Sequence, residues 1–318
     1  MQNTYAPEGS LIGTPHNNEY VSSLKGLEKA MQDGIILEGT VTLCDSKMRL
    51  HLELGEIEGI IEKEESVLCR DGERLKDIAV ITRVGKPVCF KVIGIRQSGG
   101  QTIALLSRRA AQLECMKEYV EKLSCGDVID AVVTHMESFG AFVDIGCGIS
   151  SLLSVDSISV SRISHPSDRL SIGMRIHAVV KAKDNENGRV FVSMRELLGS
   201  WIENAAEFEA GQTVVGIVRS VESYGVFIEL SPNLAGLAEI RDNEKDTKLA
   251  TVGQRITVYI KSIIPERMKI KLVMIDSYGG DLPPKKIKYY VDTDTTRHID
   301  YWLYSPEGCR KQIESIFE

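Results

Sequence analysis

The chain has few of the features that mark membrane, secreted or disulfide-bonded proteins. No apolar run approaches the roughly 18 residues of a membrane span, and the first residues lack both the charged and the apolar region of a secretion signal. The seven cysteines are an odd number without a C-x-x-C pair, which indicates reduced, mostly packed thiols. We therefore expect a cytoplasmic protein with no metal and no other cofactor.

Motifs of common enzyme chemistry are also missing. The sequence contains no G-x-x-x-x-G-K-[ST] phosphate loop, no H-E-x-x-H zinc motif and no G-x-S-x-G nucleophile turn. The six histidines are dispersed along the chain. We expect a protein that is not an enzyme.

An excess of positive charge is absent. The 38 basic and 45 acidic residues give a net charge of -7, which argues against a protein that binds nucleic acid through general positive charge. The charge is uneven, however: residues 34–109 and 211–276 each carry +1, and residues 125–196 carry -2. The acidic surplus therefore lies mostly in tails and linkers.

The chain does contain an internal repeat. Residues 137–146 recur as residues 222–230 with an offset of 85, and further along Gly173 matches Gly253 with an offset of 80. A five-residue deletion in one connecting loop explains the change, since loops tolerate length changes. Five short strands in about 70 residues, with glycines at the bends, are typical of an OB-type barrel.

Alternation of apolar and polar residues predicts the strands of each repeat. In the second repeat they are Val128 to Met136, Phe139 to Ile145, a short strand near Leu152, Ile176 to Lys183, and Arg189 to Ser193. In the last strand, Val190 and Val192 face the core and leave Arg189 and Phe191 outside. In the third repeat, Lys269 and Lys271 face outward in the same way.

The repeated run also predicts an aromatic platform. Residues three apart on a regular strand point to opposite faces, so we expect a bulge at Gly140 and at Gly225 that brings two rings to one face. The ring pairs are Phe139 with Phe142 and Tyr224 with Phe227. The first ring of each pair is expected to be exposed, whereas the second is equally compatible with partial burial in the barrel.

The predicted fold is mainly β, with three tandem five-stranded OB-fold barrels joined by short helices and a small α+β C-terminal extension. The expected parts are a disordered tail (1–24), a degenerate repeat one (25–110), a linker helix (111–124), repeat two (125–196), a second linker helix (197–210), repeat three (211–276), and a C-terminal hairpin and helix (277–318). Trp201 is expected to anchor its helix on the third barrel. The hairpin should pair Lys286 to Val291 with His298 to Tyr304, and the helix should begin at Ser305. The extension either docks on the third barrel or contacts RNA.

Residues 34–276 resemble a known family. The run 138–146, Leu152, and Asp184 followed by residues 188–193 are similar to the S1 domain, and the consecutive repeats with their linker resemble the bacterial small-subunit ribosomal protein S1 family. The resemblance implies single-stranded RNA lying across strands two and three and the edge of strand five. The family's usual contacts are two aromatic residues, a histidine, an aspartate and a basic residue.

The implied contacts differ between the repeats. Repeat two has Phe139, Phe142, Asp184 and Arg189, with Ser154 in the histidine position, and repeat three has Tyr224, Phe227 and Lys269, with Glu239 for the histidine and Pro265 for the aspartate. Phe191 and Lys271 complete the candidate RNA-binding set. Repeat one places Met48 and His51 at the ring positions, so the platform is missing there. Asp184 is equally plausible as a turn residue.

Together these features predict a non-catalytic protein that binds single-stranded RNA, mRNA in particular, and acts in translation or RNA metabolism. The alternative is a protein-docking adapter that tethers RNA to the ribosome or to a degradation complex. Repeat one is the candidate contact with the small ribosomal subunit. We expect a monomer that does not bind a membrane.

Overall fold

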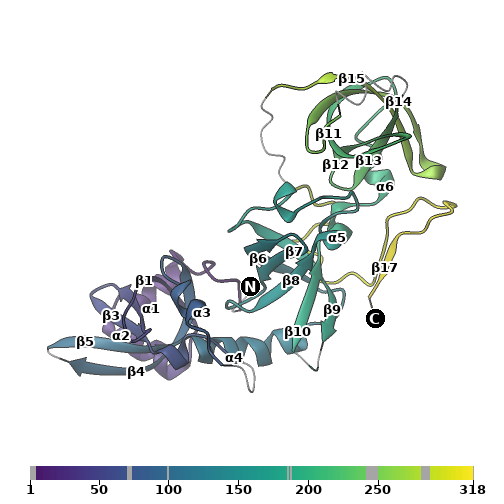
Figure 1. Cartoon of the computed structure of the whole chain (residues 1–318). Coiled ribbons are helices and arrows are strands. Elements are labelled where there is room, and N and C mark those ends of the chain that lie inside the picture. The colour runs from purple at the N-terminus through teal and green to yellow at the C-terminus, as the bar shows by residue number, and fades with distance from the viewer. Residues whose placement is uncertain are drawn as a thin grey trace. The chain divides into compact units, whose positions relative to one another are not determined.

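The computed structural model describes residues 5–69, 74–98, 100–184, 186, 188–240, 250–280 and 287–317. These residues form a mainly β protein with three closed five-stranded barrels (Figure 1), which confirms the predicted fold class. The strands belong to two compact units. The first unit contains the first barrel and residues 143–151, and the second contains most of the second barrel, the third barrel and the C-terminal segment.

The three barrels share one topology. In each, the first strand pairs with the second, the second with the third, the third with the fifth in parallel, and the fifth with the fourth, which closes on the first. Barrel one consists of β1 (Leu37–Cys44), β2 (Leu50–Leu54), β3 (Ile57–Ile61), β4 (Pro87–Ser98) and β5 (Gln101–Ser107). Barrel two consists of β6 (Val128–Glu137), β7 (Gly140–Asp144), β8 (Ser150–Ser154), β9 (Arg175–Asp184) and β10 (Arg189–Ser193). Barrel three consists of β11 (Thr213–Glu222), β12 (Gly225–Ser231), β13 (Leu234–Glu239), β14 (Arg255–Ile264) and β15 (Lys269–Ser277).

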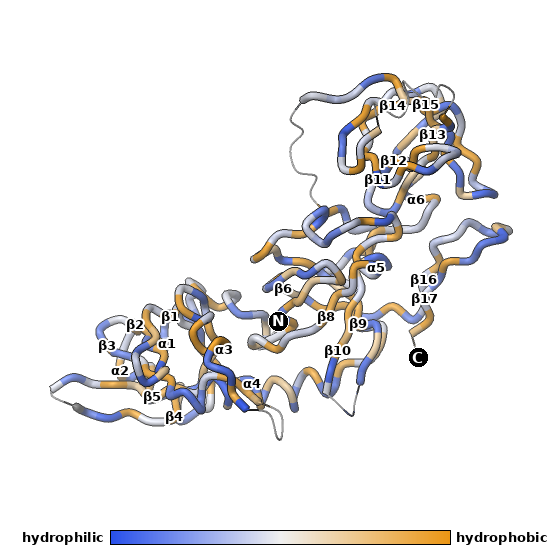
Figure 2. The backbone as a smooth tube through the Cα atoms, viewed as in Figure 1, coloured by the Kyte–Doolittle hydropathy of each residue, from blue (hydrophilic) through white to orange (hydrophobic). Residues whose placement is uncertain are grey.

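The strand positions reproduce the sequence repeat. β6 and β11 begin 85 residues apart, as do β7 and β12, whereas β9 and β14 begin 80 apart, as do β10 and β15. Apolar and polar residues alternate along the strands (Figure 2). Val190 and Val192 are buried, Arg189 is exposed and Phe191 is half-buried. The two valines of β10 therefore point to the core and the other two side chains point outward, as the alternation predicts.

Short helical segments accompany the barrels. Before barrel one lie α1 (Pro15–Val21) and α2 (Leu24–Asp33), and between β3 and β4 lie η1 (Lys63–Glu65) and α3 (Asp77–Ile81). The loop between β8 and β9 carries α5 (Val155–Ile158) and η3 (Pro166–Asp168), and η5 (Pro265–Arg267) joins β14 to β15. The linkers are α4 (Arg108–Glu118) with η2 (Val120–Lys122), and η4 (Arg195–Leu198) with α6 (Trp201–Ala205).

Each linker helix starts at a serine whose hydroxyl accepts a backbone N–H. Ser107 Oγ accepts from Ala110 N at 2.8 Å, and Ser200 Oγ accepts from Glu203 N at 3.3 Å. Capping of this kind stabilises a helix by about 1 kcal/mol. Trp201 is only 2% exposed and packs into the core of barrel three, which confirms its predicted role as an anchor.

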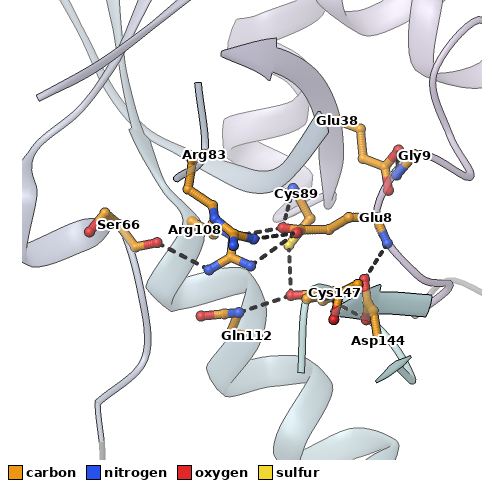
Figure 3. A network of polar contacts seen from close by, with 12 residues as sticks. Glu8, Gly9, Glu38, Ser66, Arg83, Cys89, Arg108, Gln112, Asp144 and Cys147 are labelled. Carbon is orange, nitrogen blue, oxygen red and sulfur yellow. Dashed lines mark hydrogen bonds and ion pairs between the residues drawn. The ribbon is translucent and has the colours of Figure 1, made fainter. Parts of the chain in front are cut away.

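The prediction of a disordered tail is wrong for residues 5–22, because they include the helix α1 and because the Glu8 side chain, only 8% exposed, is a centre of polar contacts (Figure 3). Its carboxylate accepts from Arg108 Nε at 2.6 Å and from the Cys89 N–H at 3.1 Å. Its own N–H donates to Asp144 Oδ2 at 2.7 Å. Composition cannot reveal this order, because the partners lie about 80 to 140 residues away in sequence.

The buried charges in this network shift one another's pKa. Burial alone would raise the pKa of Glu8, but the Arg108 guanidinium outweighs burial and lowers it. Burial, with the Glu8 charge beside it, raises the pKa of Asp144 to about 7. Burial also raises the pKa of Glu38 to about 7, although its carboxylate accepts backbone N–H groups from Gly9 and Leu11.

The predicted C-terminal hairpin and helix are also wrong. Residues 287–291 form no strand, and residue 286 lies outside the described residues. Instead β16 (Tyr301–Leu303) pairs with β17 (Glu314–Ile316). The Ser305 hydroxyl does not cap a helix; it accepts from Ile313 N at 2.9 Å and donates to Lys311 O at 2.8 Å, so it closes a loop.

The C-terminal segment docks on the second unit, one of the two alternatives that the sequence left open. Trp302 and Tyr304 are buried in the core of barrel three. Tyr289 and Phe317 pack against a small cluster that includes Val128 and Val179 of barrel two. The tail is therefore part of the fold over most of its described length.

The structure bears on the membrane and metal expectations in turn. In the part of the chain that the structure describes, no helix is long and apolar enough to cross a bilayer. The described His, Cys, Asp and Glu residues form no group of three or more that could hold a metal ion. All seven cysteines are free thiols, and four of them are buried.

Candidate nucleic-acid interface

The first ring of each predicted pair lies in a two-residue turn between two strands. Ser138 and Phe139 connect β6 to β7, and Ser223 and Tyr224 connect β11 to β12. Because a turn residue is free of the alternation within a strand, its side chain can extend into solvent. Phe139 is 53% exposed and Tyr224 is 60% exposed, so both rings are accessible.

The expected bulge at Gly225 is wrong. Gly225 pairs regularly with Glu222 on one side and Glu239 on the other, and the irregularity in β11 lies between Val218 and Ser220 instead. The turn alone brings Tyr224 to the outer side, so the platform needs no bulge at the glycine.

The two glycines have a different physical role. A Cβ at Gly140 would lie 2.6 Å from Leu153 O, and a Cβ at Gly225 would lie 2.7 Å from Ala238 O. Neither glycine has a positive φ. Glycine is therefore required here because the neighbouring strand's carbonyl approaches closely.

The ring pairs of barrels two and three have the same geometry. The centroids of Phe139 and Phe142 are 6.1 Å apart, those of Tyr224 and Phe227 are 6.2 Å apart, and both pairs meet edge to face at 89°. Phe142 and Phe227 are half-buried, which agrees with partial burial in the barrel, one of the two alternatives left open for the second ring. An edge-to-face pair is a stable aromatic arrangement, so the half-buried ring of each pair supports the exposed one.

A third ring was missed by the sequence analysis. His135 in β6 stacks on Phe142, with centroids 6.2 Å apart and planes inclined by 22°. Its Nε2 lies 2.7 Å from Glu137 Oε1. The only sign of this ring in the sequence is the place of His135 on the strand that precedes the turn. The family resemblance instead places the histidine contact at the position of Ser154. Barrel two therefore presents three aromatic groups in a row.

The strand pairing places the second ring beside the basic strand. In barrel three, Phe227 pairs with Leu237, and Leu237 pairs with Lys271 across the parallel β13–β15 ladder. Lys269 and Lys271 are both exposed. In barrel two, Leu152 pairs with Phe191 in the same way. Apolar side chains and cations thus share an outer surface in barrel two and in barrel three.

Asp184 lies directly opposite Arg189 at the end of the β9–β10 hairpin. The carboxylate is half-buried and the arginine is exposed, so the pairing fits both an orienting role and a turn role. In barrel three the residue opposite Lys269 is Ile264. The sequence assignment of this position to Pro265 is therefore wrong by one residue, and the carboxylate is absent at that position.

Barrel one lacks the ring pair, as its sequence predicts. Met48 lies in the β1–β2 turn with φ 63°. His51 Nδ1 lies 2.7 Å from Glu58 Oε1, and its Nε2 lies 3.3 Å from Asp45 Oδ2. This surface carries a cluster of polar contacts, in which Arg49 also forms an ion pair with Asp45, where the other barrels carry rings.

Comparisons with known proteins agree on one family. Residues 122–195 match the model of the S1 RNA binding domain. The chain is 31% identical over 199 residues to "Small ribosomal subunit protein bS1" of Leuconostoc lactis, covering 59% of this chain and 46% of that protein. It is 30% identical over 259 residues to the protein of the same name in Neisseria meningitidis serogroup B (strain ATCC BAA-335 / MC58), covering 78% of this chain and 44% of the relative. This chain thus spans about half the length, or less, of these curated relatives.

Proposed function

Because the chain belongs to the bacterial S1-like family, we propose that it binds single-stranded RNA, mRNA in particular, without acting as an enzyme. Barrels two and three carry the contacts, and the protein works as a cytoplasmic monomer in translation or RNA metabolism. The observation that supports this most strongly is the repeated pair of rings, with Phe139 and Tyr224 each more than half exposed.

The chemistry of the surface fits unpaired nucleotides. An exposed ring stacks on any base and contributes about 1–3 kcal/mol. Arg189 in barrel two and Lys269 and Lys271 in barrel three are exposed, each on the outer surface of its own barrel, where they neutralise phosphates. Phe191, half-buried beside Leu152, widens the apolar part of the surface. A duplex hides the faces of its bases, so this surface selects single strands.

The salt dependence of binding tests the proposal. If the two barrels cover about five phosphates, each contributing about -0.7, the slope of log K against log salt concentration is about -3 to -4. The experiment is a titration of the full chain against an unstructured, labelled RNA at several salt concentrations, with a duplex of the same length as the control. A flat response, or equal affinity for the duplex, contradicts the proposal.

A second function, docking to the small ribosomal subunit, is favoured by barrel one. Met48 and His51 stand at its ring positions, with His51 bonded to Glu58, while α3 exposes Ile78 at 62% and Ile81 at 47%. Exposed apolar residues that gather on one short helix favour a protein contact. In this view barrel one holds the chain on the ribosome and barrels two and three hold RNA.

Substitutions separate the two functions better than truncation, because removing residues 1–110 would take away Glu8, the partner of Asp144. The double variant Ile78→Ser and Ile81→Ser should lose co-sedimentation with small ribosomal subunits and keep its RNA affinity. Ile172→Ser, 66% exposed in the second unit, is the matched control. If the double variant co-sediments as well as the unsubstituted chain, the proposal that barrel one docks to the small ribosomal subunit is contradicted.

A further inference from the structure

A groove of about 1060 Å³ lies beside the ring pair of barrel three. The barrel contributes Tyr224, Phe227 and Lys269 to its lining. Residues 308–311 of the C-terminal segment contribute another part of the lining. This groove thus joins the ring pair of barrel three to the C-terminal segment, which lies outside the three barrels.

The C-terminal part of the lining is held firmly in place. The backbone N–H of Trp201 donates to the backbone carbonyl of Tyr304 at 2.9 Å. The Tyr304 hydroxyl donates to the backbone carbonyl of Asn233. Ser305 closes the loop by its contacts with Lys311 O and Ile313 N. Because both the anchor and the loop closure are hydrogen-bonded, the backbone that carries residues 308–311 needs little ordering when a ligand binds.

The groove is strongly basic although the chain as a whole is acidic, with a net charge of -7. Its charged lining residues are the cations Arg267, Lys269, Arg310 and Lys311 and the carboxylate Glu266. All five residues are exposed. Exposed cations next to an exposed ring match a ligand that has both bases and phosphates.

We propose that the C-terminal loop is a second wall of the RNA-binding site of barrel three, in which Arg310 and Lys311 bind phosphates of a strand that stacks on Tyr224. This inference rests on the proposed RNA binding and extends it to a segment outside the barrels. An acidic peptide is the competing ligand, but it would leave the exposed ring without a stacking partner. The platform therefore favours RNA.

The test is a double substitution, Arg310→Ala with Lys311→Ala, in the full chain. If each cation neutralises one phosphate, the salt slope falls in magnitude by about 1.4, and affinity at about 0.1 M salt falls by about 25-fold, with no difference near 1 M. The matched control is Lys25→Ala with Lys117→Ala, which removes the same charge from exposed positions outside the groove. Binding is measured by fluorescence anisotropy with a labelled uridine oligomer of about 15 nucleotides, and thermal unfolding checks that each variant is folded.

The possible results are distinguishable. The inference is overturned if unsubstituted protein binds the oligomer and the Arg310 and Lys311 variant keeps the affinity and slope of the control. It is also overturned if that variant loses binding of a labelled oligoglutamate but keeps binding of RNA. If the unsubstituted protein does not bind the oligomer at all, the proposed function itself fails, and the inference fails with it.

Discussion

Removal of the Tyr224 ring should weaken RNA binding without unfolding barrel three. The ring is 60% exposed and lies in a turn, so its truncation exposes little new core. A base stacked on it contributes about 1–3 kcal/mol, which corresponds to a loss of about 5- to 150-fold in affinity for Tyr224→Ala. Phe139→Ala should cost a similar factor, and the two losses should multiply because the rings lie on different barrels and do not touch.

Two controls make this prediction specific. Tyr224→Phe keeps the ring and should keep the affinity. Tyr259→Ala removes another exposed tyrosine of barrel three, 38% exposed on β14 and outside the groove, and should also leave affinity unchanged. The assay is equilibrium anisotropy at fixed salt concentration. The reasoning is refuted if Tyr224→Ala binds as tightly as Tyr259→Ala, because stacking would then contribute nothing.

Three further predictions concern stability. Folding raises the pKa of Glu38 from 4.5 to about 7, so the folded state favours the protonated carboxyl. The contribution of this group to the free energy of unfolding is therefore full below pH 4.5 and is lost as the pH rises through 7. At about 1.4 kcal/mol per pKa unit the loss is about 3.5 kcal/mol. The unfolding free energies of the unsubstituted chain and of Glu38→Gln, measured by urea titration, should therefore diverge between about pH 4.5 and about pH 7, and curves that stay parallel over this range would contradict the prediction. Arg108→Met leaves the Glu8 carboxylate buried without its main partner and should cost about 3–5 kcal/mol in the same assay, whereas a cost below about 1 kcal/mol would show that water replaces the arginine. Gly225→Ala places a Cβ 2.7 Å from Ala238 O and should lower the unfolding midpoint of barrel three by an amount equivalent to about 1–3 kcal/mol, a result that an unchanged midpoint would contradict.

Local pattern was sufficient to predict the barrels. The strand starts follow the offsets of 85 and 80 read from the sequence, because alternation with period two and turn glycines are properties of neighbouring residues. The exposed positions of Phe139 and Tyr224 follow from the same pattern. The mechanism assigned to Tyr224 was wrong, since a two-residue turn, rather than a bulge at Gly225, brings its ring outward.

Order that depends on distant partners could not be predicted. Residues 5–22 look like a flexible tail by composition, and only the folded chain brings Glu8 to Arg108. The Ser305-Pro306 pair has the local signal of a helix start, but the Ser305 hydroxyl bonds residues six and eight positions ahead and closes a loop. The stacking of His135 on Phe142 and the basic loop at Arg310 likewise arise from tertiary contacts that no local window contains.

The most direct measurement is photo-crosslinking of the full chain to an unstructured RNA that contains 4-thiouridine, followed by mapping of the modified peptides. The account predicts adducts in the peptides that carry Phe139 with Phe142 and Tyr224 with Phe227, and fewer in the peptides of barrel one. Adducts confined to residues 37–107, with none in barrels two and three, would contradict it.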